Sequence, residues 1–408
     1  MSPGFLFVSL PTGELRVVPH HDSSLQIAGL LAFGARDNSR RGFLLVSRVL
    51  GKHIPSIPQQ MQHVHEQLAS LVAKCSQSVP GDAVVIGMAE TATGLGLGIF
   101  DQLRSRYEPQ AWRYYFQTTR YARKTNHFDG FVKSHAGIGF KELHSHAVDI
   151  RLEVPECPVA RRRLLEAETV LLIDDEITTG QTFLNLIEAL QSHNSRLRNV
   201  LVATICDFSD GVAQQLLSTN TRGIDSVQVV SLVSGRIEFD SRIKRDTVSL
   251  SSAPLTFYDG EWSRFSARQG ICRAEVIPES ILFAAAVLAG LGKCLVLGTT
   301  EFMDPAFRLA IQLQQFGLDC RVQSTTRSPL LVAGDITAKR AVPDLYSPNT
   351  PSYLYNYSRE DYESIIVVHE TSDHSLARQL CLNLADGRDC IEVDLLRLRV
   401  IRHSENRT

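Results

Sequence analysis

Two adjacent acids, Asp174 and Asp175, precede a short run of threonines and glycine, and these residue types together suit a phosphorylated sugar. The residues before them, 170–173, are all apolar and predict a buried parallel strand. Apolar residues at helical spacing over 183–190 predict a helix directly after the run. The free N–H groups at a helix N-terminus bind anions, and Gly180 lets the backbone approach a phosphate closely. Hydroxyl donors would come from Thr178, Thr179 and Thr182.

The two carboxylates also need a binding partner, because acids beside a phosphate would repel it. A ribose offers two hydroxyl donors, so a ribose phosphate accounts for both the acids and the threonines. An ordinary strand-to-helix turn with threonines that cap the helix is the alternative.

The pattern Asp-Asp-x-x-Thr-Thr-Gly-x-Thr after an apolar strand resembles the phosphoribosyl pyrophosphate (PRPP) signature of type I phosphoribosyltransferases. The resemblance implies a Rossmann-like α/β fold, with Asp174 and Asp175 as catalytic residues that hold the ribose hydroxyls. Mg²⁺ is the cofactor expected with PRPP and could also bind at these two acids. Glu176 departs from the usual pattern, and this third acid could assist Mg²⁺ or simply face solvent. The 5-phosphate would bind to Thr178, Thr179, Gly180, Gln181 and Thr182.

A second predicted strand, 83–86, runs into a turn of small residues and threonines. Its place in the chain corresponds to the pyrophosphate loop of type I phosphoribosyltransferases, so the resemblance assigns Ala89, Glu90 and Thr91 to that loop. Taken alone, this pattern is common to many strand–turn–helix units. Lys52 and His53 could add to the same phosphate site, and a surface loop with stray charges is the alternative.

Basic residues follow the next predicted strand, 112–116. A leaving pyrophosphate needs cationic donors. We expect Arg120 and Lys124 to be catalytic and Arg123 to bind pyrophosphate, and a solvated basic loop is the alternative.

Residues 127–141 contain three glycines and little periodicity, which predicts a mobile loop. Type I phosphoribosyltransferases close a hood over PRPP from this part of the fold, and the closure keeps water from the reacting carbon. His144 and His146 are hood or acceptor candidates, either as an acid/base or metal pair or as structural residues. Asp207, at the end of another predicted strand, is the acceptor-side candidate.

The composition fits a globular cytoplasmic protein, with 44% hydrophobic and 21% charged residues among 408. A net charge of −2 gives no basic field for nucleic acid. The eight cysteines form no Cys-x-x-Cys pair, which predicts reduced thiols rather than a zinc site or a disulfide framework. The apolar residues 5–8 lack the features of a signal peptide. The longest apolar stretch, 281–292, is too short to span a bilayer, so we expect no membrane partner.

We expect three segments: a PRPP-binding domain over 1–248, a linker over 249–274 and a smaller α/β domain over 275–408. Near the N-terminus the sequence predicts two short strands and then a helix over 25–33.

The C-terminal third repeats features of the first domain. A predicted strand leads into Gly298 and Glu301, and the next ends in Thr325-Thr326-Arg327, as Gly87 and Glu90 are followed by Thr118-Thr119-Arg120. Our hypothesis is that residues 275–408 are a diverged copy of the first unit, and chance similarity of generic strand–helix units is the alternative. A candidate site there would comprise Glu301, Thr325, Thr326, Arg327 and Ser328, in which Arg327 could bind an anion or only anchor a turn.

A phosphoribosyltransferase-like domain followed by Thr326-Arg327-Ser328-Pro329 resembles a bacterial family with a C-terminal TRSP domain. Arg36 and Asn38 with the block 43–55, and the sequence His-Ser-His-Ala at 144–147, also resemble that family, which is associated with tellurium resistance and stress response. The resemblance implies a glycosyltransferase (pentosyltransferase) of nucleotide metabolism. It would transfer 5-phosphoribosyl from PRPP to an unidentified acceptor during synthesis of a nucleoside-like metabolite. A PRPP-sensing regulator without turnover is the alternative, and a homodimer is expected from type I relatives.

Overall fold

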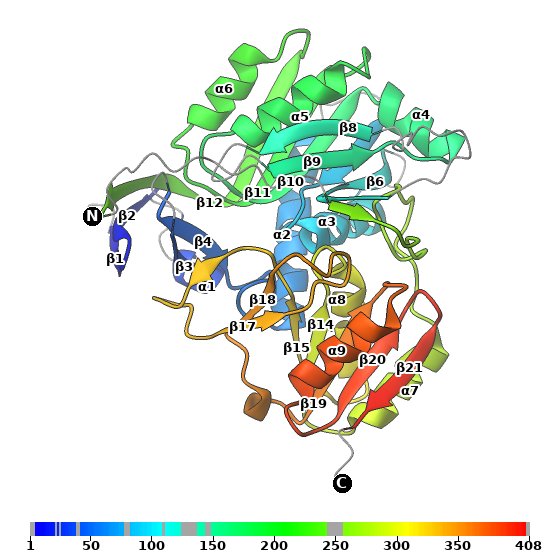
Figure 1. Cartoon of the computed structure of the whole chain (residues 1–408). Coiled ribbons are helices and arrows are strands. Elements are labelled where there is room, and N and C mark those ends of the chain that lie inside the picture. Colours follow the sequence, from blue (N-terminus) through cyan, green and yellow to red (C-terminus); the bar gives the residue numbers. More distant parts are fainter. Residues whose placement is uncertain are drawn as a thin grey trace.

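The computed structural model describes residues 5–20, 23, 26–37, 41–76, 82–107, 111–123, 137–142, 148–242 and 256–404 (Figure 1). Two sheets organise these residues, one of nine strands and one of five. Among the described residues, no helix combines the length and the apolar character needed to cross a membrane.

The larger sheet has the strand order β1-β2-β12-β11-β10-β5-β6-β9-β8. The central strands from β12 to β6 run parallel, and the strands that flank them are antiparallel. The strands are β1 (Leu6–Leu10), β2 (Gly13–Pro19), β5 (Ala83–Gly87), β6 (Trp112–Thr119), β8 (Gly137–Glu142), β9 (Val148–Glu153), β10 (Thr169–Ile177), β11 (Asn199–Asp207) and β12 (Ser226–Ser241).

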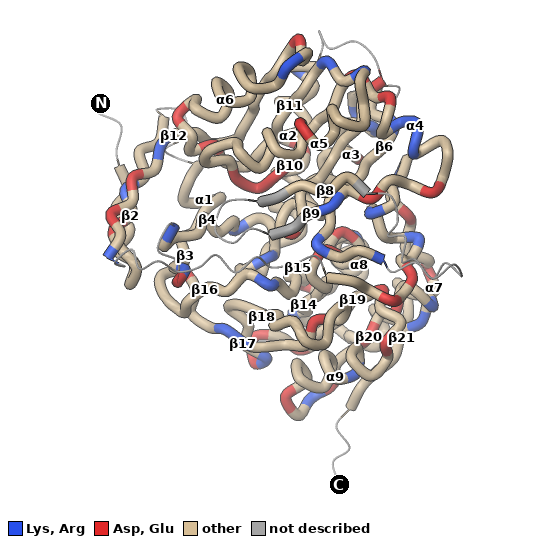
Figure 2. The backbone as a smooth tube through the Cα atoms, turned by 45° about the horizontal axis from the view of Figure 1, so that its top comes forward, with Lys and Arg blue, Asp and Glu red and all other residues tan. Residues whose placement is uncertain are grey.

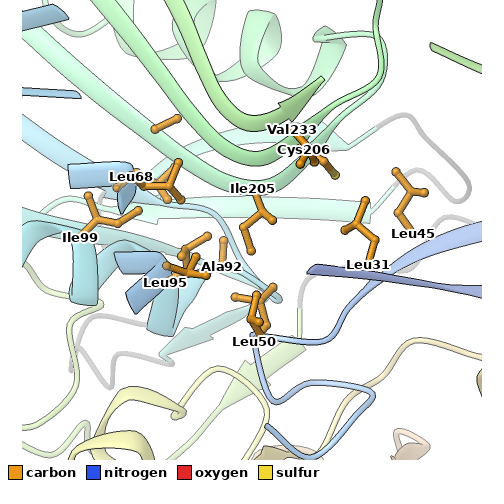
Figure 3. Packing of buried hydrophobic residues seen from close by; sticks show 14 of the residues in the cluster. Leu31, Leu45, Leu50, Leu68, Ala92, Leu95, Ile99, Ile205, Cys206 and Val233 are labelled. Carbon is orange, nitrogen blue, oxygen red and sulfur yellow. The ribbon is translucent and has the colours of Figure 1, made fainter. Parts of the chain in front are cut away.

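Helices cover both faces of the parallel centre (Figure 1). One face carries α2 (Pro58–Ser76) and α3 (Thr93–Arg106), and the other carries α4 (Pro158–Glu166), α5 (Gln181–Gln191) and α6 (Val212–Asn220). Figure 3 shows the hydrophobic core on the face covered by α2 and α3, where residues of these helices pack against residues of β11. The central strands contain runs of apolar residues because helices cover both of their faces, which explains why their positions could be predicted from the sequence.

The prediction of a helix over residues 25–33 is wrong. The structure has a four-residue helix, α1 (Ile27–Leu30), and then a strand, β3 (Leu31–Arg36). β3 lies between β4 (Phe43–Ser47) and β16 (Leu330–Leu331) in a three-stranded sheet. Hydrogen bonds to these two strands, one of them distant in sequence, outweigh the local helical spacing.

The smaller sheet has the order β15-β14-β19-β20-β21, parallel except for β21. Its strands are β14 (Lys293–Gly298), β15 (Asp319–Ser324), β19 (Ser364–His369), β20 (Cys390–Asp394) and β21 (Arg399–His403). One face packs against α7 (Glu279–Ala289) and α8 (Asp304–Gln314), and the other against α9 (His374–Ala385).

Short strand pairs also join the C-terminal part of the chain to the N-terminal part. β13 (Thr256–Tyr258) pairs with β7 (Tyr121–Arg123), and β16 pairs with β3. A separate hairpin is formed by β17 (Lys339–Val342) and β18 (Ser352–Tyr355), followed by a 3-10 turn, η2 (Arg359–Asp361). Backbone hydrogen bonds therefore join the two parts of the chain through small sheets that are separate from the two large ones.

Candidate active site

The carboxyl ends of the parallel strands bring the predicted site residues to one edge of the larger sheet. Gly87 at the end of β5 lies opposite Gln117 of β6 and Ile173 of β10, and Ile177 lies opposite Asp207 of β11. Ligands of open parallel sheets bind at this edge, where the strand order reverses. Figure 2 shows acidic residues gathered at the end of β10.

Asp174 and Asp175 lie within the last part of β10 and are half-buried. The N–H of Asp175 donates to Asp174 Oδ1 at 2.9 Å, which orients the first carboxylate. Burial, with the neighbouring charge of Glu176, raises the pKa of Asp175 to about 6. Two acids held this close favour a ligand that offers hydroxyl groups or positive charge.

Glu176 does not simply face solvent. One of its carboxylate oxygens is 2.7 Å from Arg41 Nη2, and the two side chains are 16% and 12% exposed. Arg41 also lies over the ring of Phe43, at 4.8 Å from its centroid. An arginine from the N-terminal segment thus neutralises the third acid and reduces the negative charge beside Asp175.

The loop after β10 ends at the N-terminus of α5. Gly180 has a φ of 81°, in the left-handed region that glycine tolerates, and a Cβ there would lie 3.1 Å from the Cβ of Ala213. Thr179 is exposed, and its Oγ1 accepts from the N–H of Gln181 at 3.4 Å. Thr182 is 7% exposed, and its Oγ1 has no hydrogen-bond partner among the described residues. A buried hydroxyl without a partner at a helix N-terminus suits an anionic ligand.

A side chain of β6 forms a hydrogen bond with the backbone of the turn after β5. The N–H of Ala89 donates to Thr118 Oγ1 at 2.7 Å, and the Ala89–Glu90 peptide bond is cis. Glu90 is 4% exposed and lies 3.1 Å from Lys52 Nζ and 3.5 Å from Arg120 Nη1. Burial would raise the pKa of Glu90, but the charges of Lys52, Arg120 and Arg327 outweigh burial and lower the pKa to about 2. Glu90 is therefore a buried anion that forms ion pairs with cations from two other segments, Lys52 and Arg120.

Lys52 and His53 lie between this turn and the C-terminal part of the chain, because Lys52 contacts both Glu90 and Thr300. Lys52 is 1% exposed, and its Nζ donates to the carbonyl of Thr300 at 2.5 Å as well as pairing with Glu90. His53 is buried, and burial lowers its pKa to about 3, which keeps the ring neutral.

The remaining predicted residues of the first domain fall into two groups. Arg120 and Arg123 are described, and Arg123 Nη2 pairs with Glu156 at 2.6 Å. The Asp207 carboxylate accepts from the N–H and the Oγ of Ser209 at 2.8 and 2.6 Å, and so orders the turn before α6. The second group lies outside the described residues and comprises Lys124, His144 and His146.

The predicted C-terminal residues lie against the same turn. The N–H of Arg327 donates to Glu90 Oε1 at 3.3 Å, and its guanidinium pairs with Asp344 at 2.8 Å and lies over the ring of Tyr121. Ser328 Oγ accepts from Arg36 at 3.3 Å. The backbone of Arg327 thus holds Glu90, while its side chain is anchored elsewhere.

Sequence reasoning missed two buried arginines. Arg151 of β9 lies opposite Thr119, is 8% exposed, and has its Nε and Nη2 without partners among the described residues. Burial lowers its pKa. Arg268 is fully buried between Glu301 and Glu370. Neither stands in a motif, and Glu301 and Glu370, the ion-pair partners of Arg268, are distant in sequence, so no local signal could have identified them.

Comparison with known proteins agrees with this geometry. Residues 30–236 match the family described as phosphoribosyl transferase (PRTase_2), and residues 267–384 match the TRSP domain that lies C-terminal to it. No curated protein matches the sequence.

Solved structures that match include three phosphoribosyltransferases. APRTase from Giardia lamblia, complexed with 9-deazaadenine, is 16% identical, with 49% of this chain and 94% of that chain covered and a TM-score of 0.31. Adenine phosphoribosyl transferase from Trypanosoma brucei, in complex with AMP, pyrophosphate and ribose-5-phosphate, is 13% identical, with 58% and 92% covered and a TM-score of 0.33. Orotate phosphoribosyltransferase from Francisella tularensis is 16% identical, with 42% and 66% covered and a TM-score of 0.25. Because the first family match spans more than half of the 408 residues, the chain belongs to the phosphoribosyl transferase family and carries a TRSP domain C-terminal to it.

Proposed function

We propose that this protein transfers the 5-phosphoribosyl group of PRPP to a nucleophilic, nucleobase-like acceptor and releases pyrophosphate. The observation that carries the proposal is the continuous arrangement at the end of β10, where two acids are followed by a helix N-terminus with the unpartnered Thr182 hydroxyl. In the reaction, the bond from the anomeric carbon to pyrophosphate breaks, and its electron pair leaves with pyrophosphate. The lone pair of the acceptor forms the new bond at the same carbon.

Different residues bind different parts of PRPP in this proposal. Asp174 and Asp175 accept hydrogen bonds from the ribose hydroxyls, and the loop 178–182 with the α5 N-terminus binds the 5-phosphate. The turn 89–91 and Arg120 face the diphosphate, with Arg123 and Lys124 as further cations. Lys52 acts on that group through Glu90, with which it forms an ion pair, and we keep the neighbouring His53 as a residue of this side on the basis of the sequence. Carboxylate oxygens suit Mg²⁺, which would neutralise diphosphate charge, and Asp174 and Asp175 are the residues that would hold it.

The acceptor side is the less defined part of the proposal. Asp207 lies beside the end of β10, and its carboxylate already orders the turn before α6. We keep His144 and His146 as hood or acceptor residues on the basis of the sequence. A nucleoside-like product, made in the cytoplasm as part of a tellurium-resistance or stress response, is the pathway that the family resemblance favours.

A second candidate function is PRPP sensing without turnover. It is favoured by Glu90, which already pairs with Lys52 and Arg120. A diphosphate at this turn would compete with a buried carboxylate for the same cations. A protein that only binds PRPP does not have to stabilise a leaving pyrophosphate and would not need these cations free.

The experiment that tests the binding site is calorimetric titration of PRPP with Mg²⁺ into wild type and Asp174→Asn/Asp175→Asn. We expect micromolar binding to wild type and none to the variant, because both ribose acceptors lose their charge. Asp225→Asn, a change at an exposed turn before β12, is the matched control and should bind as wild type does. Equal binding to wild type and the double variant would contradict the proposed roles of the two acids.

A further inference from the structure

The two sheets share one topology. Numbered by their order in the chain, the five central strands of the larger sheet lie side by side as 2-1-3-4-5, in the arrangement β6-β5-β10-β11-β12. The smaller sheet, β15-β14-β19-β20-β21, has the same order. Its fifth strand is antiparallel, whereas β12 is parallel to its neighbour. In both sheets a helix, α3 or α8, connects the first strand to the second.

The strand registers align the two units residue by residue. Gly87 lies opposite Gln117 and Ile173, and Gly298 lies opposite Ser324, one step beyond the pair Leu297–Val367. Glu301 therefore corresponds to Glu90, and Glu370 corresponds to Asp175. By the same register, residues 325–327 correspond to residues 118–120, and both read Thr-Thr-Arg.

One hydrogen bond inside each unit confirms the alignment. In the first unit, the N–H of Ala89 donates to Thr118 Oγ1 at 2.7 Å. In the second, the N–H of Thr300 donates to Thr325 Oγ1 at 3.0 Å. Chance similarity of generic strand–helix units does not predict the same side-chain contact at the same register.

The contacts between the units are reciprocal. Glu301 of the second unit accepts from the N–H of Arg120 at 2.7 Å and from Thr119 Oγ1 at 2.6 Å in the first. Glu90 of the first unit accepts from the N–H of Arg327 at 3.3 Å in the second. The carboxylate of each glutamate thus accepts hydrogen bonds from residues at the end of the second strand of the other unit. The two units are related as the two halves of a symmetric dimer would be.

A buried arginine lies at the strand ends of the second unit. The guanidinium of Arg268, from the segment between the units, is 3.1 Å from Glu301 and 2.5 Å from Glu370. It also lies 4.2 Å from the centroid of the Trp262 ring. An internal cation therefore pairs with the two residues that correspond to Glu90 and Asp175 of the first unit.

We propose that the C-terminal unit is a second copy of the phosphoribosyltransferase-type unit that has lost its own site and serves as the built-in partner of the first. Through Glu301 it fixes Thr119 and the backbone of Arg120, and through the N–H of Arg327 it fixes Glu90. These contacts hold the diphosphate side of the site in its binding geometry. Thr119 and Glu301 are positioning residues, and this role rests on the proposed function.

The test compares Thr119→Val with Thr119→Ser. Valine keeps the shape of threonine but cannot donate to Glu301, whereas serine keeps the hydroxyl. Calorimetry with Mg²⁺ measures the Kd of each variant for PRPP and for ribose 5-phosphate, which lacks the diphosphate. We expect Thr119→Val to weaken PRPP binding about tenfold, the effect of losing one hydrogen bond to a charged group, with ribose 5-phosphate binding unchanged. Thr119→Ser should match wild type for both ligands.

Two results would overturn the inference. One is unchanged PRPP binding by Thr119→Val, and the other is an equal loss for both ligands, which would indicate a general structural effect. If Thr119→Val does not fold, Glu301→Gln applies the same comparison of the two ligands from the other side of this contact, because glutamine keeps the length of the side chain but not its charge. Failure of wild type to bind PRPP would instead refute the proposed function, so the two failures are distinguishable.

Discussion

Removal of Arg41 tests how the site tolerates three consecutive acids. The Arg41–Glu176 pair is separated by 2.7 Å, and the side chains are only 12% and 16% exposed. Breaking a buried pair by removing one partner costs about 3–5 kcal/mol because a charge stays buried without compensation. Both groups keep slight contact with solvent, so we expect Arg41→Met to lower the free energy of unfolding by about 3 kcal/mol. Methionine keeps an apolar side chain over Phe43.

The assay is urea unfolding of Arg41→Met, Glu176→Gln and the double variant. Because the double variant leaves no buried charge at this position, we expect it to recover most of the loss, with a coupling energy above about 1 kcal/mol. A single variant as stable as wild type would refute the reasoning. So would a double variant whose loss equals the sum of the two single losses.

Four further predictions concern the ligand site and the assembly. Because the pKa of Asp175 is raised to about 6, its carboxylate becomes protonated as pH falls through 6, and calorimetry between pH 5 and 8 should show PRPP affinity falling at the acidic end; a flat profile would contradict this. Because the pKa of Asp175 is raised in the folded state, the ionised side chain destabilises the folded protein above pH 6. Asp175→Asn should therefore raise the Tm at pH 8, and an unchanged or lower Tm would contradict this assignment. Thr182→Val removes a buried hydroxyl that has no partner among the described residues, so thermal stability should be unchanged or higher while affinity for ribose 5-phosphate falls about tenfold; equal affinity would remove Thr182 from the site. If the C-terminal unit takes the place of a partner subunit, light scattering should give a monomer of 45.3 kDa, whereas a dimer would favour the homodimer expected from type I relatives.

The central strands and the loops at their ends could be predicted from the sequence because their determinants are local. Residues 170–173 are apolar on both faces, and the acids, threonines and glycine that follow are adjacent in the chain. The repeat of Thr-Thr-Arg at 118–120 and 325–327 was also visible, and the common strand order agrees with it.

Contacts between distant segments could not be predicted. Residues 31–33 of the expected helix belong to β3, because residues 330–331 complete its sheet. Arg41 and Arg268 find their partners 135 and 102 residues away. The crossing of Glu90 and Glu301 between the two units depends on how the sheets are placed, which no local pattern encodes.

The central claim is that PRPP is turned over at the β10 edge, and pyrophosphate release tests it most directly. Phosphorus NMR can follow PRPP and Mg²⁺ with wild type and a panel of nucleobases. Our account predicts that pyrophosphate accumulates in step with a new phosphoribosyl compound for at least one acceptor, and that Asp174→Asn/Asp175→Asn forms none. If wild type binds PRPP but produces no pyrophosphate with any acceptor, the transferase claim is contradicted and the sensing function takes its place.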